Sequence, residues 1–337
     1  MVYRIPSSFN VSRFSGASDI HRILTRAEAN AVDSETTSIN TIRMKKFMRF
    51  AMAVALALQG CALLDAGDYA SRAFMRESDP ALAKDAFPTM IKAAEAIQLA
   101  DPDDQGAATL VASLYVMYAN AFLDGEAFLL PDEAFEERLG LARRANALYL
   151  RAAALLAPFV EARAPGALGL AVVTEDPSLA RLGKKDVPTL YWAAAAILAA
   201  FASDPMDFDN AARVSGALAL FERARAVEPD WNGGALHELA ISVYGSLPTE
   251  LGGDRAKARA AFELAKAASS ASSPGAFVAY ASSVCTPEGD ADGFAQALET
   301  ALGLPDRPES ALMDAIARRK ARRLLDDKDL YFYLGDI

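Results

Sequence analysis

The sequence predicts an all-α protein built from stacked helix pairs, and three observations indicate this fold class. Alanine-rich stretches with leucine, glutamate, arginine and lysine, which favour helices, fill most of the chain between proline and glycine breaks. Alternating Val/Ile/Thr runs, the usual signal of strands, are almost absent from the sequence. A spacing of small and aromatic residues typical of paired helices recurs along the second half of the chain.

Residues 1–43 differ from the rest of the chain. They are rich in Ser, Thr and Asn and show no sustained apolar period, so we expect either a disordered extension or a misplaced gene start. The segment that begins at Met44, MKKFMRFAMAVALALQGC, forms a complete secretory signal by itself. Met44 or Met48 is therefore the expected true start.

Residues 44–60 are typical of a lipoprotein signal peptide. Basic residues precede a short apolar run over 50–58, whereas a membrane-spanning helix needs roughly 20 apolar residues. The run LQGC, which ends at Cys61, resembles the lipobox of bacterial lipoproteins, where the chain is cut before a diacylated cysteine. That resemblance implies a lipid anchor on Cys61, stable if it carries two or more acyl chains. The alternative is a short buried helix with an inert thiol.

Residues 61–337 are expected to form one all-α domain with a strongly acidic surface. The whole chain has 34 Lys/Arg and 44 Asp/Glu, of which eight and four lie in residues 1–60, so this domain carries a net charge of −14. Such a domain is a poor partner for nucleic acid. With Cys61 acylated, Cys285 has no cysteine partner, and no intramolecular disulfide is expected.

Ten helices are expected in this domain, and several begin or end at an acid–proline pair such as Asp79-Pro80 or Glu228-Pro229. The expected ranges are 80–99, 105–128, 131–157, 188–203, 207–228, 232–246, 254–271, 275–285, 290–303 and 308–325. The most apolar stretch, Leu190–Ala202, has only thirteen residues, and we interpret it as a buried core helix rather than a membrane span.

One helical spacing recurs in three copies and matches the second helix of a tetratricopeptide repeat. In that repeat, small residues admit a neighbouring helix, an aromatic residue fills the groove, and proline ends the helix. The copies are Ala217/Phe221/Ala224 with Pro229, Ala258/Phe262/Ala265, and Ala145/Tyr149/Ala152 closed by Pro158. Two successive copies favour a tetratricopeptide-like solenoid with additional N-terminal helices and a concave binding face, and a generic helical bundle remains the alternative.

The order of segments resembles the T components of TRAP transporters, which are periplasmic tetratricopeptide lipoproteins. The resemblance covers about residues 61–335 and is strongest after residue 187. Its motifs are Tyr191-Trp192, Trp231, His237, the Leu247-Pro248 loop with Gly252-Gly253, and Tyr280-Ala281. The resemblance implies an anchored solenoid, a homo-oligomer, that meets the solute-binding P component of a transporter for organic acids or other small ligands.

The sequence offers little that would support catalysis. HELAIS begins like a zinc-protease helix, but Ile241 stands where the second histidine ligand is required. The motifs for phosphate loops and nucleophile elbows are missing, so neither a metal nor a cofactor is expected, and a non-enzyme is predicted. A third hypothesis is an enzyme that uses His237 with Cys285 as a nucleophile pair. The position of Cys285 at the end of an apolar, core-like helix argues against this hypothesis, because it favours a buried structural thiol.

Six residues are the candidates for binding a small hydrophobic or carboxylate ligand, because aromatic surface supplies area and polar groups supply orientation. They are Tyr118, Asn120, Trp192, Trp231, His237 and Tyr244. Alternatively, these side chains fill the grooves between repeats. The leading hypothesis is thus a lipid-anchored scaffold that docks a solute-binding protein, and the runner-up is a stand-alone ligand-binding lipoprotein with an aromatic cleft.

The C-terminal helix carries the cations Arg318, Arg319, Lys320, Arg322 and Arg323. We expect a solvated last helix, with LYFYL packing back as the terminal cap of the solenoid. A docking patch for an acidic partner or for lipid head groups is the alternative.

Overall fold

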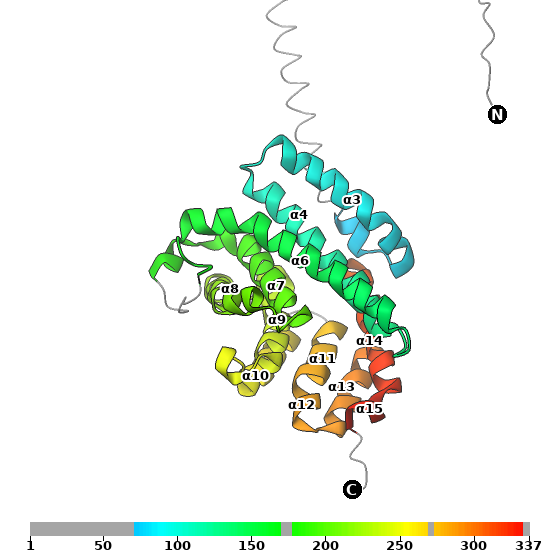
Figure 1. The fold of residues 1–337 in the computed structure, drawn as a ribbon. Coiled ribbons are helices and arrows are strands. Elements are labelled where there is room, and N and C mark those ends of the chain that lie inside the picture. Colours follow the sequence, from blue (N-terminus) through cyan, green and yellow to red (C-terminus); the bar gives the residue numbers. More distant parts are fainter. Residues whose placement is uncertain (1–70, 170–176, 269–272, 333–337) are drawn as a thin grey trace, which may run out of the picture. The chain divides into compact units, whose positions relative to one another are not determined.

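The computed structural model describes residues 71–169, 177–268 and 273–332, and every regular element in these ranges is a helix (Figure 1). They belong to one compact unit that begins at Ser71. The all-α prediction is confirmed for this part of the chain. The leader, Cys61 and the expected lipobox lie outside the described residues.

The helices follow one another along the described residues, and each expected range overlaps at least one of them. The α-helices are α3 (Pro80–Ala100), α4 (Gln105–Tyr118), α5 (Gly125–Leu129), α6 (Phe135–Arg163), α7 (Val187–Ser203), α8 (Phe208–Val227), α9 (Trp231–Ser246), α10 (Arg255–Ala267), α11 (Pro274–Tyr280), α12 (Thr286–Glu288), α13 (Ala291–Gly303), α14 (Ala311–Asp326) and α15 (Lys328–Phe332). Two π-helical turns continue α4 and α11, namely η1 (Ala119–Asp124) and η5 (Ala281–Cys285). The 3₁₀ turns are η2 (Pro177–Arg181), η3 (Lys184–Asp186), η4 (Thr249–Leu251) and η6 (Pro308–Ser310).

Aspartate caps fix several of the helix starts. Asp79 precedes Pro80, and its Oδ1 accepts a hydrogen bond of 2.9 Å from the backbone N–H of Ala81. Asp207 and Asp254 cap α8 and α10 in the same way. Of the acid–proline pairs, Asp79-Pro80 therefore marks a helix start and Glu228-Pro229 follows a helix end, as predicted.

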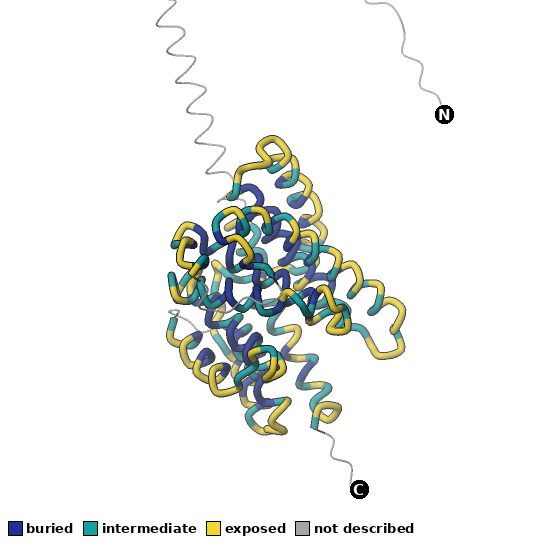
Figure 2. The backbone as a smooth tube through the Cα atoms, turned by 60° about the vertical axis from the view of Figure 1, so that its left-hand side comes forward, coloured by how far each residue is buried: buried dark blue, intermediate teal, exposed yellow. Residues whose placement is uncertain are grey.

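Neighbouring helices pack in pairs, as expected for a tetratricopeptide-like arrangement. Packed neighbours include α3 with α4, α6 with α7, α7 with α8, α9 with α10, and α13 with α14. Ala217, Phe221 and Ala224, the best copy of the repeat spacing, are fully buried between them. Figure 2 shows buried positions along the inward faces of neighbouring helices, with the connections exposed. The core is thus distributed along the series of helix pairs.

Pro158 does not end its helix, which corrects the expectation that the third repeat copy closes there. Helix α6 continues to Arg163 with Pro158 inside it. Leu156 and Val160, on either side of the proline, are buried. Burying the two side chains is worth about 1.5–3 kcal/mol each, which offsets the roughly 3 kcal/mol that an interior proline costs.

Helix α9 touches η5 backbone to backbone. A Cβ atom at Gly245 would lie 2.6 Å from the carbonyl oxygen of Ser283, so only glycine fits at this position. The Ser246 hydroxyl donates a hydrogen bond of 2.9 Å to the Ser283 hydroxyl beside that contact. Helix α9 is therefore joined directly to the C-terminal helices.

Two helical stretches, Gln105–Leu129 and Lys184–Ser203, are long and apolar enough to cross a membrane by length and composition. However, 72% and 67% of their most apolar windows are buried inside the fold, as in core helices of other proteins. The second stretch contains Leu190–Ala202, and its burial agrees with the interpretation of that segment as a core helix.

The C-terminal helices pack as the sequence suggests. The rings of Tyr331 and Phe332 lie 5.8 and 5.0 Å from the ring of Phe294, so this part of the LYFYL segment folds back onto α13. Two of the five cations are paired with acids: Arg318 with Asp306, and Arg323 with Asp327. These two arginines therefore form ion pairs within the fold.

Candidate functional site

A cavity of about 680 Å³ lies between α4, α7 and α9, next to the start of α14. Ligand-binding cavities typically measure roughly 300–1,000 Å³, so it is large enough for a small organic molecule. Its walls are formed by Val116, Met117, Asn120, Tyr191, Trp192, Ala195, Leu198, Ala199, Phe201, Ala202, Pro205, Leu239, Ser242, Val243, Ser246, Leu247, Pro248 and Met313. We call this cavity the aromatic pocket.

Small residues on α7 make room for the aromatic pocket. Trp192, Ala195 and Ala199 follow one another at helical spacing, so they share one face of the helix, and that face lines the pocket. Ala194 and Ile197 are buried in the core. Helix α7 therefore serves both as a core element and as a wall, and its alanines leave the space empty where larger residues would fill it.

Two aromatic contacts fix the rings at one end of the pocket. The ring of Tyr191 lies 4.9 Å from that of Trp192, edge to face, and 4.9 Å from that of Trp231. Burial is the main cause that raises the pKa of Tyr191, and the negative charge of Glu238 adds to it. Tyr191 is therefore a neutral phenol at neutral pH. Trp231 packs behind Tyr191 and is not among the residues that line the pocket.

Asn120, which is exposed, adjoins a hydrogen-bond network around the buried Tyr149. Tyr149 on α6 donates a hydrogen bond of 2.6 Å to Oδ2 of Asp124, and the side chain of Asn120 hydrogen-bonds to the same tyrosine hydroxyl. Burial raises the pKa of both Tyr149 and Asp124. Asn120 and Asp124 are the second and last residues of the π-helical turn η1, and such turns are frequent at functional sites.

Tyr118 and His237 lie elsewhere. The ring of Tyr118 packs at 5.7 and 5.8 Å from the rings of Phe87 and Phe122, in a cluster next to the core. His237 is only 4% exposed, and its Nε2 lies 3.0 Å from Oδ1 of Asp230, just before the start of α9. These contacts are those of packing residues, and neither side chain lines the aromatic pocket.

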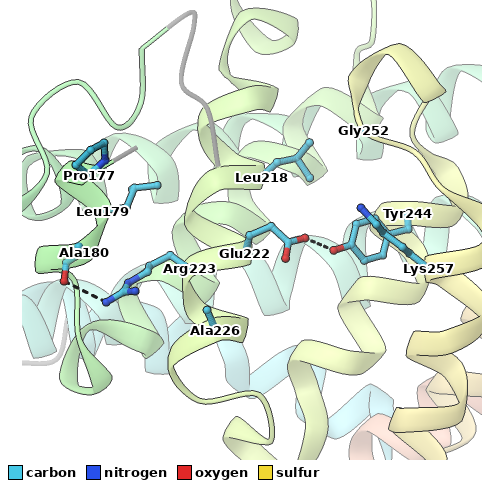
Figure 3. Close-up of a pocket in the computed structure, with 10 residues that line it drawn as sticks. All are labelled: Pro177, Leu179, Ala180, Leu218, Glu222, Arg223, Ala226, Tyr244, Gly252 and Lys257. Carbon is cyan, nitrogen blue, oxygen red and sulfur yellow. Dashed lines mark hydrogen bonds between the residues drawn. The ribbon is translucent and has the colours of Figure 1, made fainter. Parts of the chain in front are cut away.

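Tyr244 lines a different cavity, of about 550 Å³, shown in Figure 3. Its hydroxyl donates to Glu222 and accepts a hydrogen bond of 2.6 Å from Arg225. Lys257 lies over the tyrosine ring, 5.4 Å from its centroid. Burial is the largest cause that raises the pKa of Tyr244. Because these polar groups satisfy one another, this cavity offers a ligand fewer unpaired partners than its size suggests.

The structure therefore brings together two of the six ligand candidates, Asn120 and Trp192, in one cavity. It adds wall residues from α9 that the sequence analysis did not single out, namely Leu239, Ser242 and Ser246. These three residues follow one another at spacings of three and four, which places them on one helical face. That spacing is the sequence signal that could have identified these three residues as one face of a helix.

Cys285 lacks the surroundings of a nucleophile. The thiol is buried, and burial is the largest cause that raises its pKa to about 11. Reactive cysteines show the opposite shift. Among the residues that the structure describes, no group of three or more His, Cys, Asp or Glu side chains is arranged to hold a metal ion.

Comparison with known proteins gives two similarities. Residues 76–332 match the family model described as TRAP transporter T-component. A protein of Treponema pallidum (strain Nichols), described only as an uncharacterized protein, is 33% identical over 261 residues. That similarity covers 75% of this chain and 80% of the Treponema protein.

Proposed function

Because the chain belongs to the TRAP transporter T-component family, we propose that it is a lipid-anchored scaffold that docks the solute-binding subunit of a TRAP-type transporter. The family implies association with TRAP transporter subunits and a periplasmic, transporter-associated location, and it is a transporter accessory family rather than an enzyme family. The family match over residues 76–332 is the observation that carries this proposal.

The mechanism we propose for docking is surface complementarity at a raised local concentration. A lipid anchor at Cys61 keeps the scaffold at the membrane, where the permease resides. Tethering one partner near the other raises its effective concentration, so even a weak contact between them is populated. A homo-oligomer of the scaffold would multiply the docking sites.

The proposed scaffold also holds a small hydrophobic or carboxylate ligand in the aromatic pocket. Its volume of about 680 Å³ and its walls of aromatic, aliphatic and alanine side chains support this assignment. Asn120, whose side chain contacts the Tyr149 hydroxyl, supplies a polar group at the pocket wall. In the alternative function, the protein binds a ligand in this pocket without docking a partner.

Docking is tested by purification from membranes. The full chain with a C-terminal tag, extracted in mild detergent, is expected to bring down a TRAP solute-binding protein identified by mass spectrometry. The Cys61→Ser variant is the matched control: it is expected in the soluble periplasmic fraction with less partner bound. Repeated recovery of the scaffold without any solute-binding protein, under conditions that retain other lipoprotein complexes, contradicts docking and favours the stand-alone protein.

Ligand binding is tested through the fluorescence of Trp192. The chain has only two tryptophans, so Trp231→Phe leaves Trp192, on the pocket wall, as the reporter. Titration with 1-decanol, an uncharged probe, is expected to change its emission with saturation. Ala199→Phe fills the pocket and is expected to abolish the change. Ala226→Phe, in the cavity of Figure 3, is expected to leave it intact.

A further inference from the structure

A second, smaller cavity of about 110 Å³ lies next to the aromatic pocket. Asn120 lines both cavities, and α14 contributes to both, with Met313 in the aromatic pocket and Ile316 and Lys320 in the smaller one. Since a water molecule takes about 30 Å³ of liquid, the smaller cavity has room for a few waters or for a head group the size of a carboxylate. We call it the lysine cavity.

Lys320 lines the lysine cavity beside the ring of Phe128. Its side chain is accessible to solvent, and its Nζ lies 5.3 Å from the centroid of the Phe128 ring. Burial among these groups is the largest cause that lowers the pKa of Lys320, and the Asp124 carboxylate acts in the opposite direction.

The acids that line the lysine cavity already have donors. Asp124 accepts the hydrogen bond of 2.6 Å from the Tyr149 hydroxyl. Glu126 accepts from Lys84, with which it forms an ion pair. Within the described part of the chain, Lys320 forms no ion pair, and its contact with Asp124 is a longer-range electrostatic one. The cavity is therefore lined by two cations, Arg319 and Lys320, that form no ion pair within the described residues, and Asp124 in the same cavity acts on Lys320 at longer range.

The spacing along α14 gives the distance between the two cavities. Met313 and Lys320 are seven residues apart on one continuous helix, which corresponds to about 10 Å along its axis. Asn120 of η1 lines both cavities. A molecule with an apolar body in the aromatic pocket and an acidic group near Lys320 would therefore have to be about 10 Å long.

We propose that Lys320 is the anion-binding end of the ligand site, and that the ligand is an amphiphile with a carboxylate head and an apolar chain. The carboxylate accepts hydrogen bonds from the Lys320 ammonium, the chain lies against Trp192 and the α7 alanines, and Asn120, which lines both cavities, contacts the ligand between its two ends. This inference rests on the proposed ligand-binding function and specifies the chemical class of its ligand. Charge-assisted hydrogen bonds of this kind are among the strong ones in proteins.

The test compares decanoate with 1-decanol, which share the same chain and differ in the head group. Both are titrated into the full-length Trp231→Phe protein at neutral pH with Trp192 fluorescence as the readout. We expect decanoate to bind about tenfold more tightly than 1-decanol, since one charge-assisted hydrogen bond is worth about that factor. Lys320→Met is expected to remove this preference by weakening decanoate about tenfold while leaving 1-decanol unchanged.

Arg322→Met is the matched control, because Arg322 is a cation on the same helix that lines neither cavity. It is expected to leave both affinities unchanged. Equal binding of the two probes by the Trp231→Phe protein with Lys320 intact overturns the inference, and this comparison does not depend on the folding of the Lys320→Met variant. Decanoate binding that survives Lys320→Met overturns it too, whereas failure of both probes to bind overturns the proposed ligand pocket as well.

Discussion

Arg163, the last residue of α6, donates a hydrogen bond of 2.8 Å from Nη1 to Oδ2 of Asp186, whose side chain is only 1% exposed. The same carboxylate accepts a hydrogen bond of 2.9 Å from the backbone N–H of Gly183. Asp186 directly precedes α7, the helix that forms one wall of the aromatic pocket. The ion pair therefore joins the two ends of the 164–186 connection and fixes where α7 begins.

Replacing Asp186 by Asn should destabilise the protein by about 2–3 kcal/mol, because it leaves the Arg163 charge unpaired beside a buried amide. Urea denaturation followed by circular dichroism measures the loss. Asp292→Asn, at an exposed position in the first turn of α13, should change the stability by no more than about 0.5 kcal/mol. Equal stabilities of the two variants would show that the buried ion pair contributes nothing.

Two phenylalanines on α8 provide a test of the repeat core. Phe221 is fully buried at the aromatic position of the repeat, whereas Phe208 at the start of the same helix is 86% exposed. Phe221→Ala should cost about 3–5 kcal/mol through lost burial and the cavity it leaves. Phe208→Ala should be nearly neutral in thermal or chemical unfolding. A loss below 1 kcal/mol at Phe221 would mean that α8 is not packed as the structure has it.

Glu238 should make stability depend on pH. Burial is the largest cause that raises its pKa above the ordinary 4.5, the hydrogen bond with Ser273 and the charge of Arg307 oppose that shift, and Asp314 adds to it. The folded state therefore holds this proton more tightly than the unfolded state. As the pH rises from 4.5 through the higher folded pKa, the unfolded state ionises first, and stability falls.

Glu238→Gln keeps the size and a hydrogen-bonding group for Ser273 but cannot ionise. We expect it to flatten the pH dependence, with a gain in melting temperature over the parent protein at pH 8 and little difference at pH 4. Differential scanning calorimetry at several pH values measures this. Parallel curves for the two proteins between pH 4 and 8 would refute the assignment.

Cys285 should be inert to thiol reagents in the folded protein. A pKa of about 11 leaves on the order of one thiol in a thousand ionised at pH 8, and the side chain is buried. In the Cys61→Ser background, the chain has no other cysteine. A chromogenic disulfide reagent is expected to label Cys285 only after guanidinium is added, and labelling within seconds of mixing with native protein would contradict the burial.

Local signals predict much of the helical architecture. Asp79-Pro80 marks the start of α3 because a side-chain cap and a proline both act within a single turn. The Ala217, Phe221 and Ala224 spacing identified buried positions because burial on a helix follows its period. The predicted end of α6 was wrong. Pro158 is a local signal for a helix end, and the burial of Leu156 and Val160 overrides it.

The site was less predictable, because it depends on which side chains meet in space. Tyr149 was identified as a repeat position and Asn120 as a ligand candidate, but nothing in the sequence places both on one hydroxyl with Asp124. The π-helical turn that presents Asn120 has no simple sequence signature. Tyr244 and Trp192 were equally plausible as aromatic candidates, and only their three-dimensional neighbours separate them.

The glycine at position 245 has a mechanical consequence. Helix α9 presents Ser242 and Ser246 to the aromatic pocket, and it rests on Ser283 with no side chain between the two backbones. A contact of this kind has no compressible layer, so α9 cannot shift toward η5 without pushing the C-terminal helices along. Any displacement of α9 toward η5 by a bound ligand would therefore be transmitted to the C-terminal helices through this backbone contact.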